Sequence, residues 1–129
     1  MVTNILTEEM VQKGAGLIKK LDEVELTPAV AFWLFSSDNN TWKLFIAEKE
    51  MAKKGPRYFY KKIQYLIYKT LDLRDFPLEN IVIMPVNDPL CLLIRMAVKT
   101  EEKDISKIYF QHSSINGVMV EDALIYRVN

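Results

Sequence analysis

Residues 55–71, with the sequence GPRYFYKKIQYLIYKTL, form the segment around which the rest of the chain is organised. Pro56 suits the first position of a helix, because its missing N–H would have no partner inside a helix there. With about 100° of rotation per residue, one side of this helix carries Phe59, Ile63, Leu66, Ile67 and Thr70. The stripe predicts a central helix that ends near Leu71 and packs against a sheet.

The opposite side of the predicted helix is basic and aromatic. It carries Arg57, Tyr58, Lys61, Lys62, Tyr65, Tyr68 and Lys69, which we name the basic-aromatic face. Between residues 51 and 71 the chain has six basic residues and no acidic residue. Lys53, Lys54 and Arg57 lie near the positive end of the helix dipole, where each cation costs about 0.3–1 kcal/mol at low salt. The free N–H groups at that end of a helix attract anions.

Two interpretations of the basic-aromatic face follow from the sequence. The first is a binding site for an anionic partner, which is an acidic protein, a nucleic acid or a phosphate-containing ligand. The second is an ordinary solvated helix surface, on which the lysine stems lie over tyrosine rings. The local excess of cations in a neutral chain is the reason to test the first interpretation.

Composition limits the classes of function. The chain has 129 residues, half of them apolar, which predicts a single α+β domain over residues 1–129. Lys plus Arg and Asp plus Glu both total 17, so the net charge is zero. A protein that coats DNA carries an excess of basic residues, so that role is not expected.

Signals for export, membrane insertion and cysteine chemistry are weak. The N-terminal residues 1–4 do not have the basic segment and apolar stretch of a secretory signal. The longest apolar run, Ala29–Phe35, is too short to span a bilayer. Cys91 is the only cysteine, which excludes an intrachain disulfide and a cysteine zinc site. We expect a cytoplasmic protein with no membrane contact and no cofactor.

Patterning along the chain predicts three helices and five strands. The expected helices follow Thr7 as far as Asp22–Glu25, then cover residues 56–71 and 89–98. The expected strands are Ala29–Phe35, Thr41–Ala47, Asn80–Val86, Ile105–Ile115 and Val118–Val128. The order is α-β-β-α-β-α-β-β, with one mixed five-stranded sheet. The core is expected to include Phe32, Leu34, Leu44, Ile63, Leu66, Ile81 and Ile83.

The last two strands are joined at Asn116-Gly117, the strongest short hairpin signal, because both turn positions need a positive φ. Strict alternation puts Asp122 on the apolar face of Val120 and Leu124. Either Asp122 is buried with a partner, or a bulge at Glu121-Asp122 turns it outward.

The helix over residues 89–98 has Arg95 as its only polar residue. A helix that is apolar nearly all round is buried on more than one side. If the rest of the chain does not cover it, Leu92 and Met96 are candidates for a homodimer interface. A homo-oligomer is therefore expected.

Catalytic and metal-binding motifs are missing from the sequence. His112 is the only histidine, and a general base needs an oriented partner that the sequence does not supply. The glycines are too scattered for a phosphate-binding loop. The one carboxylate-x-lysine match, Glu101-Glu102-Lys103, lies in a predicted loop rather than on the strand that a magnesium-dependent nuclease requires. We assign no catalytic residue and no metal ligand.

One resemblance spans most of the chain. An aromatic strand hairpin precedes Gly55-Pro56-Arg57, and the C-terminal part contains Asn116-Gly117-Val118 and the segment EDALIYR at 121–127. In this layout the chain resembles small uncharacterised prokaryotic α+β proteins with no assigned activity. The resemblance implies no catalytic residue.

The sequence thus predicts a non-enzymatic binding or protein-interaction module that uses the basic-aromatic face. The alternative is an enzyme acting on nucleic acid or a phosphate-containing ligand, with Glu48, Glu50 or Asp122 as its acid. If these acids and Arg57 line one cleft, the geometry favours the enzyme. If they lie apart and the tyrosines lie open on the surface, it favours the binding module.

Overall fold

In the computed structural model, residues 5–111 and 113–129 are described, so the lone histidine considered above, His112, lies outside the described residues. Five strands form one sheet in the order β3-β2-β1-β7-β4. Their bounds are β1 Val30–Ser36, β2 Thr41–Glu48, β3 Ile81–Pro85, β4 Ile108–Phe110 and β7 Ala123–Val128. Only the β2–β3 pairing among these is parallel, which makes the sheet mixed. The predicted α+β class with a mixed five-stranded sheet is confirmed.

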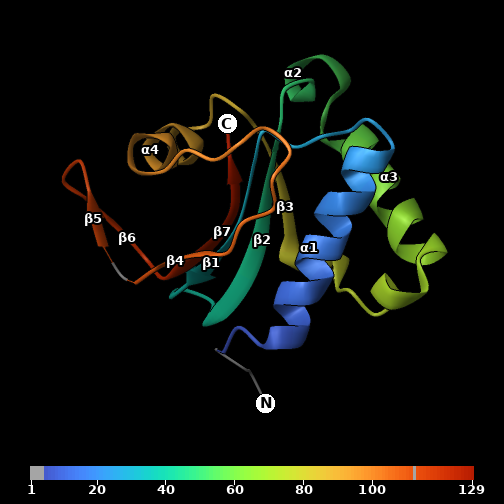
Figure 1. Cartoon of the computed structure of the whole chain (residues 1–129), viewed down its shortest axis with the longest axis horizontal. Helices are drawn as coiled ribbons and strands as arrows, with labels where there is room; N and C mark the ends of the chain where they lie inside the picture. Colours follow the sequence, from blue (N-terminus) through green and yellow to red (C-terminus); the bar gives the residue numbers. More distant parts are fainter. Residues whose placement is uncertain (1–4, 112) are drawn as a thin grey trace.

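The helices cover both faces of the sheet (Figure 1). Helices α1 Glu8–Glu23 and α3 Pro56–Lys69 pack on one face, and α4 Pro89–Ala97 packs on the other. Three short elements were not predicted: α2 Met51–Lys54, and the 3-10 helices η1 Leu71–Leu73 and η2 Leu78–Asn80. None of the described helices combines the length and the apolar character needed to cross a membrane.

Local signals in the sequence explain the helix boundaries. The Thr7 hydroxyl accepts a hydrogen bond from the Met10 N–H at 3.1 Å and so caps α1. The Asp88 carboxylate accepts from the Leu90 N–H at 2.9 Å at the start of α4. Gly55 separates α2 from α3 with a φ of 80°, a conformation that glycine adopts without steric cost.

Two apolar layers hold the sheet and its helices together. The layer under α1 and α3 includes Leu17, Trp33, Leu44 and Ile63, and the layer under α4 includes Phe32. Every residue of the expected core is buried except Leu34, which is half-buried. Leu34 packs against the buried cluster of the α4 layer but remains partly exposed.

The C-terminal strands differ from the prediction. The two long strands expected there are each divided, and β5 Ser113–Ile115 and β6 Val118–Val120 form a separate hairpin beside α4 (Figure 1). The break after β6 falls at Glu121-Asp122, where the Asp122 carbonyl accepts from the Phe35 N–H at 2.9 Å. Asp122 is exposed, so the break turns it outward, as the second alternative anticipated.

A second irregularity lies inside β7. Ala31 pairs with Arg127 but Phe32 pairs with Ile125, so Tyr126 is an extra residue in the ladder with β1. A bulge of this kind re-aims side chains that strict alternation would send to opposite faces. Tyr126 and Arg127 both reach α1, through the Val11 carbonyl and the Asp22 carboxylate.

Helix α1 lies very close to the sheet at Gly14. The Trp33 Nε1–H donates to the Tyr126 hydroxyl at 2.8 Å, and that hydroxyl donates to the Val11 carbonyl at 2.5 Å. A Cβ atom on Gly14 would lie 2.8 Å from the Trp33 Nε1 and closer still to the Tyr126 hydroxyl. Gly14 is therefore required for this close approach rather than for helix flexibility.

We expect Gly14→Ala to destabilise the protein by about 1–3 kcal/mol, because the added methyl group overpacks the contact with Trp33 and Tyr126. Gly16→Ala is the matched control in the same helix, since its Cβ would meet only Leu73 Cδ2 at 3.6 Å. That control gains helix propensity and should be neutral or stabilising. Urea unfolding measures the free energy of unfolding of both variants. Equal effects of the two substitutions would contradict the close approach.

Candidate functional site

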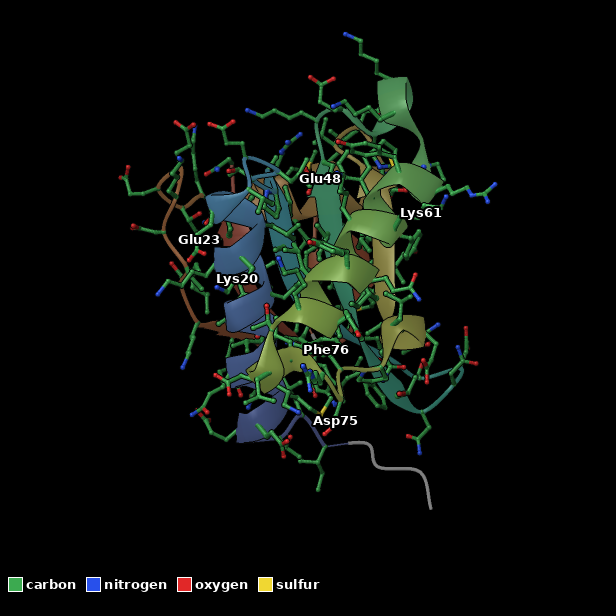
Figure 2. All side chains as sticks on the ribbon, turned by 90° about the vertical axis from the view of Figure 1, so that its right-hand side faces the viewer. Lys20, Glu23, Glu48, Lys61, Asp75 and Phe76 are labelled. Carbon is green, nitrogen blue, oxygen red and sulfur yellow. The ribbon has the colours of Figure 1, made fainter. Side chains whose placement is uncertain are left out.

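The residues of the basic-aromatic face lie on the outer side of α3. Tyr65 is 55% exposed and Tyr68 is 73% exposed, whereas Tyr58 is half-buried. The basic members Arg57, Lys61, Lys62 and Lys69 are all exposed. In Figure 2, Lys61 lies on the side of α3 away from α1. Tyr65 and Tyr68 are thus available at the surface, and Tyr58 is partly so.

Lysine side chains lie against the tyrosine rings. The Nζ atoms of Lys54 and Lys62 are 4.8 Å and 5.6 Å from the Tyr58 ring centroid. The Lys69 Nζ is 5.2 Å from the centroid of Tyr65. Within the described part of the chain, the ion pairs involve no basic residue of α2 or α3. The ammonium groups of Lys54, Lys62 and Lys69 therefore lie against tyrosine rings, and no carboxylate neutralises them in an ion pair among the described residues.

A small apolar groove adjoins the face. Its volume is about 150 Å³, and it is lined by Val24, Leu26, Tyr58, Lys62, Tyr65 and Leu66. Val24 and Leu26 come from the connection between α1 and β1, far from α3 in the sequence. Sequence reasoning did not anticipate their contribution, because nothing local to residues 24–26 indicates that they lie beside α3.

The three acids of the enzyme alternative do not come together. Glu48 and Glu50 line one pocket, together with Lys54. Arg57 is not part of that pocket lining. Asp122 contacts the Phe35 end of β1, whereas Ala47, next to Glu48, pairs with Val30 at the other end. Arg57 and Asp122 therefore lie outside the pocket that Glu48 and Glu50 line, so the four residues do not line one cleft.

The pocket at Glu48 lies at the end of the sheet where β2 stops. Figure 2 shows Glu48 between α1 and α3. The volume is about 330 Å³. Four parts of the chain line the pocket. The α1–β1 connection contributes Leu26 and Pro28, and the β2–α2 turn contributes Lys49. Helix α3 contributes Phe59, and the C-terminal segments contribute Glu102 and Asn129. The Asn129 amide donates to the Glu102 carbonyl at 2.8 Å, which holds that rim in place.

Glu48 is a buried carboxyl group without a full set of partners. It is 4% exposed, and its Oε2 atom has no hydrogen-bond partner. Burial raises the pKa of the Glu48 carboxyl to about 8, the negative charge of Asp22 adds to this rise, and Arg127 opposes it. Glu48 is therefore mainly protonated at pH 7.

Arg127, the nearby buried cation, is already committed to other acceptors. Its Nη1 and Nη2 atoms donate to both Asp22 oxygens at 2.9 Å and 2.8 Å. Further N–H groups donate to the Pro28 carbonyl at 3.3 Å and the Asp104 carbonyl at 3.1 Å. The bidentate pair with Asp22 neutralises most of the positive charge of Arg127 that could have stabilised an ionised Glu48.

A signal for Glu48 does exist in the sequence. Trp42, Leu44 and Ile46 alternate into the core along β2, and Glu48 is the next residue in that alternation. An acid in register with buried residues is a candidate for a perturbed carboxyl group. The expected strand ended one residue earlier, at Ala47, so this position was assigned to the connection that follows.

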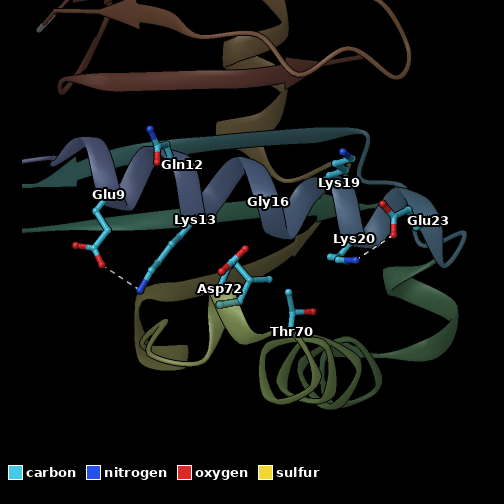
Figure 3. A pocket seen from close by; sticks show the side chains of 10 residues that line it. Glu9, Gln12, Lys13, Gly16, Lys19, Lys20, Glu23, Thr70 and Asp72 are labelled. Carbon is cyan, nitrogen blue, oxygen red and sulfur yellow. Dashed lines mark hydrogen bonds and ion pairs between the residues drawn. The ribbon is translucent and has the colours of Figure 1, made fainter.

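A larger hollow lies between α1 and η1 (Figure 3). Its volume is about 430 Å³. Two of its three lysines, Lys13 and Lys20, are paired with Glu9 at 3.2 Å and Glu23 at 3.3 Å. These side chains already have partners, and exposed pairs of this kind contribute little to recognition or stability.

Other reactive groups are not arranged as a site. Within residues 5–111 and 113–129, no three histidine, cysteine, aspartate or glutamate side chains are grouped so as to hold a metal ion. Cys91 is buried, and burial raises the pKa of its thiol to about 11. A buried thiol with a raised pKa is a poor nucleophile.

No protein-family model, no curated protein and no solved structure matches this chain. The resemblance to small prokaryotic α+β proteins therefore stays a hypothesis.

We expect the Glu48→Gln variant to lose a pH dependence of stability that the wild type has. Because the folded-state pKa of Glu48 is raised from 4.5 to about 8, the folded protein keeps a proton that the unfolded chain releases. The free energy of unfolding of the wild type should fall as the pH rises from 4.5 through 8. Each pKa unit corresponds to about 1.4 kcal/mol, so the variant gains a few kcal/mol relative to wild type above pH 8.

Urea unfolding at a series of pH values measures this difference. Glu50→Gln is the matched control, because Glu50 follows β2 closely but is exposed. The free energy of unfolding of Glu50→Gln should change with pH in the same way as that of the wild type. Parallel curves for wild type and Glu48→Gln would show that Glu48 is not protonated in the folded state.

Proposed function

We propose that this chain is a binding module, and that the basic-aromatic face of α3 binds an acidic segment of a partner protein. The observation that carries the proposal is a row of exposed cations without acidic partners, next to exposed tyrosines and an apolar groove. Protein interfaces commonly combine a small apolar centre, enriched in aromatic residues, with a polar rim. The groove supplies the centre, and Lys62 and Lys69, which lie against the Tyr58 and Tyr65 rings, supply the rim.

Two observations favour a protein partner over a nucleic acid. The faces of Tyr58 and Tyr65 are approached by lysines of the same chain, so a stacked base would have to displace them. The groove of about 150 Å³ has the size to receive one apolar side chain.

We expect the protein to bind a glutamate–tyrosine copolymer more tightly than polyglutamate, because the tyrosines fill the groove. The double substitution Lys61→Ala with Lys62→Ala should weaken copolymer binding about tenfold at about 50 mM salt, mainly through slower association. The effect should shrink as salt increases. Tyr65→Ala should cost at least about 1 kcal/mol of binding free energy, as for an interface anchor. Surface plasmon resonance measures the association rate and the dissociation rate.

The matched control is Lys19→Ala with Lys103→Ala, which removes the same charge from exposed positions outside α3. It should bind the copolymer as the wild type does. Equal weakening by both double substitutions would mean that net charge alone drives binding. Tighter binding to single-stranded DNA, RNA or duplex than to the copolymer would assign the face to nucleic acid instead.

We also propose self-association through α4, on a separate observation. Leu92 is 47% exposed and Met96 is 66% exposed, although α4 is nearly all apolar. We expect light scattering at micromolar concentration to give twice the monomer mass of 15.0 kDa. Leu92→Glu with Met96→Glu should restore the monomer, whereas Leu71→Glu, at an exposed leucine outside α4, should not. A wild-type protein that is monomeric would overturn this proposal.

A further inference from the structure

The pocket at Glu48 contains an unsatisfied polar group of the kind that a ligand completes. The Oε2 atom of Glu48 has no hydrogen-bond partner, although the side chain is 4% exposed. Buried polar atoms in folded proteins nearly always have partners, and leaving one unpaired is unfavourable. A ligand that donates hydrogen bonds to this carboxyl group would remove the penalty.

We propose that this pocket binds a small organic cation through a primary ammonium group, with Glu48 as its counter-ion. The Asp22–Arg127 pair leaves little net charge at Glu48, and the acids of the pocket lining favour a cation. Asp22 of α1 acts on Glu48 as a negative charge, and Arg127 of β7, which opposes it, is paired to Asp22 through two hydrogen bonds. The remaining charged residues of the lining are Glu25, Lys49, Glu50, Lys54 and Glu102, with acids in excess.

The shape and chemistry of the pocket fit an alkyl ammonium ion. A volume of about 330 Å³ is at the lower end of small-molecule sites. Leu26, Pro28 and Phe59 line it and provide apolar contacts for an aliphatic stem. An ammonium group donates three hydrogen bonds and is well matched by one carboxylate and nearby carbonyls. A calcium ion needs six to eight oxygen ligands, and among the described residues no three acids are grouped so as to hold a metal ion.

Binding of an ammonium group should be coupled to release of a proton. Glu48 has a pKa of about 8 in the free protein, so at pH 7 it must lose its proton to solvent before it can pair with the cation. The affinity should then rise about tenfold for each pH unit between pH 6 and 8 and level off above. Alkyl ammonium groups stay charged through this range, since their pKa is about 10.4.

Isothermal titration calorimetry tests the proposal with three probes: butylamine, 1,4-diaminobutane and the uncharged match 1-butanol. At pH 9 we expect butylamine to bind with a Kd of about 1 mM or lower. The diamine should bind more tightly, because its second ammonium group meets the acidic rim. Titrations of butylamine in buffers with different ionisation enthalpies at pH 7 should show uptake of about one proton by the buffer.

Substitutions of single residues test whether butylamine binds in the pocket at Glu48. Glu48→Gln should weaken butylamine binding at least about tenfold and remove its pH dependence, because the counter-ion is lost. Glu50→Gln, with the same change of charge at an exposed rim position, should leave binding of butylamine within about threefold of wild type. Glu48→Asp, which keeps the charge but withdraws it from the pocket, should give an intermediate Kd and serves if the glutamine variant fails to fold.

Several results would overturn the proposal. These are no saturable binding of either amine at pH 9, equal binding of butanol and butylamine, or unchanged binding in Glu48→Gln. Displacement of butylamine by an equal concentration of calcium chloride would make a metal ion the better occupant. The Lys61→Ala with Lys62→Ala variant should bind butylamine normally, so a failure of the proposed protein-binding face leaves this test intact.

Discussion

The contact between α1 and the sheet at Gly14 is the constraint on which the rest of this structure depends. The Trp33 indole, the Tyr126 hydroxyl and the Val11 carbonyl form a buried chain of hydrogen bonds that joins β1, β7 and α1. Because Gly14 has no side chain, the helix axis can lie directly over these two aromatic residues. Helix α1 leads at its C-terminal end into Val24 and Leu26, which line the groove next to the basic-aromatic face.

The bulge in β7 connects this packing to the pocket at Glu48. Because Tyr126 is an extra residue in the ladder with β1, Arg127 follows it towards α1 and meets Asp22. An arginine that is 0% exposed needs such a pair, since an uncompensated buried charge is strongly unfavourable. The pairing leaves Glu48 near two opposite charges that largely cancel. Burial then decides its ionisation, and the carboxyl group stays protonated at neutral pH.

The sequence allowed the fold class to be predicted. Of the two candidate sites, it allowed the basic-aromatic face to be predicted but not the pocket at Glu48. Helical periodicity and the Pro56 and Asp88 signals are local, and they located α3 and α4 within two residues at their ends. The basic-aromatic face follows from the same periodicity. The ionisation of Glu48 in the pocket depends on Asp22 and Arg127, whose paired side chains are 105 positions apart in the sequence. No local pattern indicates such a contact.

The place of β7 in the sheet has a consequence for the nascent chain. The strand order puts β7, the last strand in the sequence, between β1 and β4. During synthesis at about 5–20 residues per second, β1 therefore waits several seconds with one edge unpaired. Its partners in the central hydrogen-bond chain are also missing, since Trp33 and Tyr126 are 93 positions apart. An open edge with the sequence VAFWLF is a template for pairing with other chains, so early synthesis is the stage at which this strand is most exposed to aggregation.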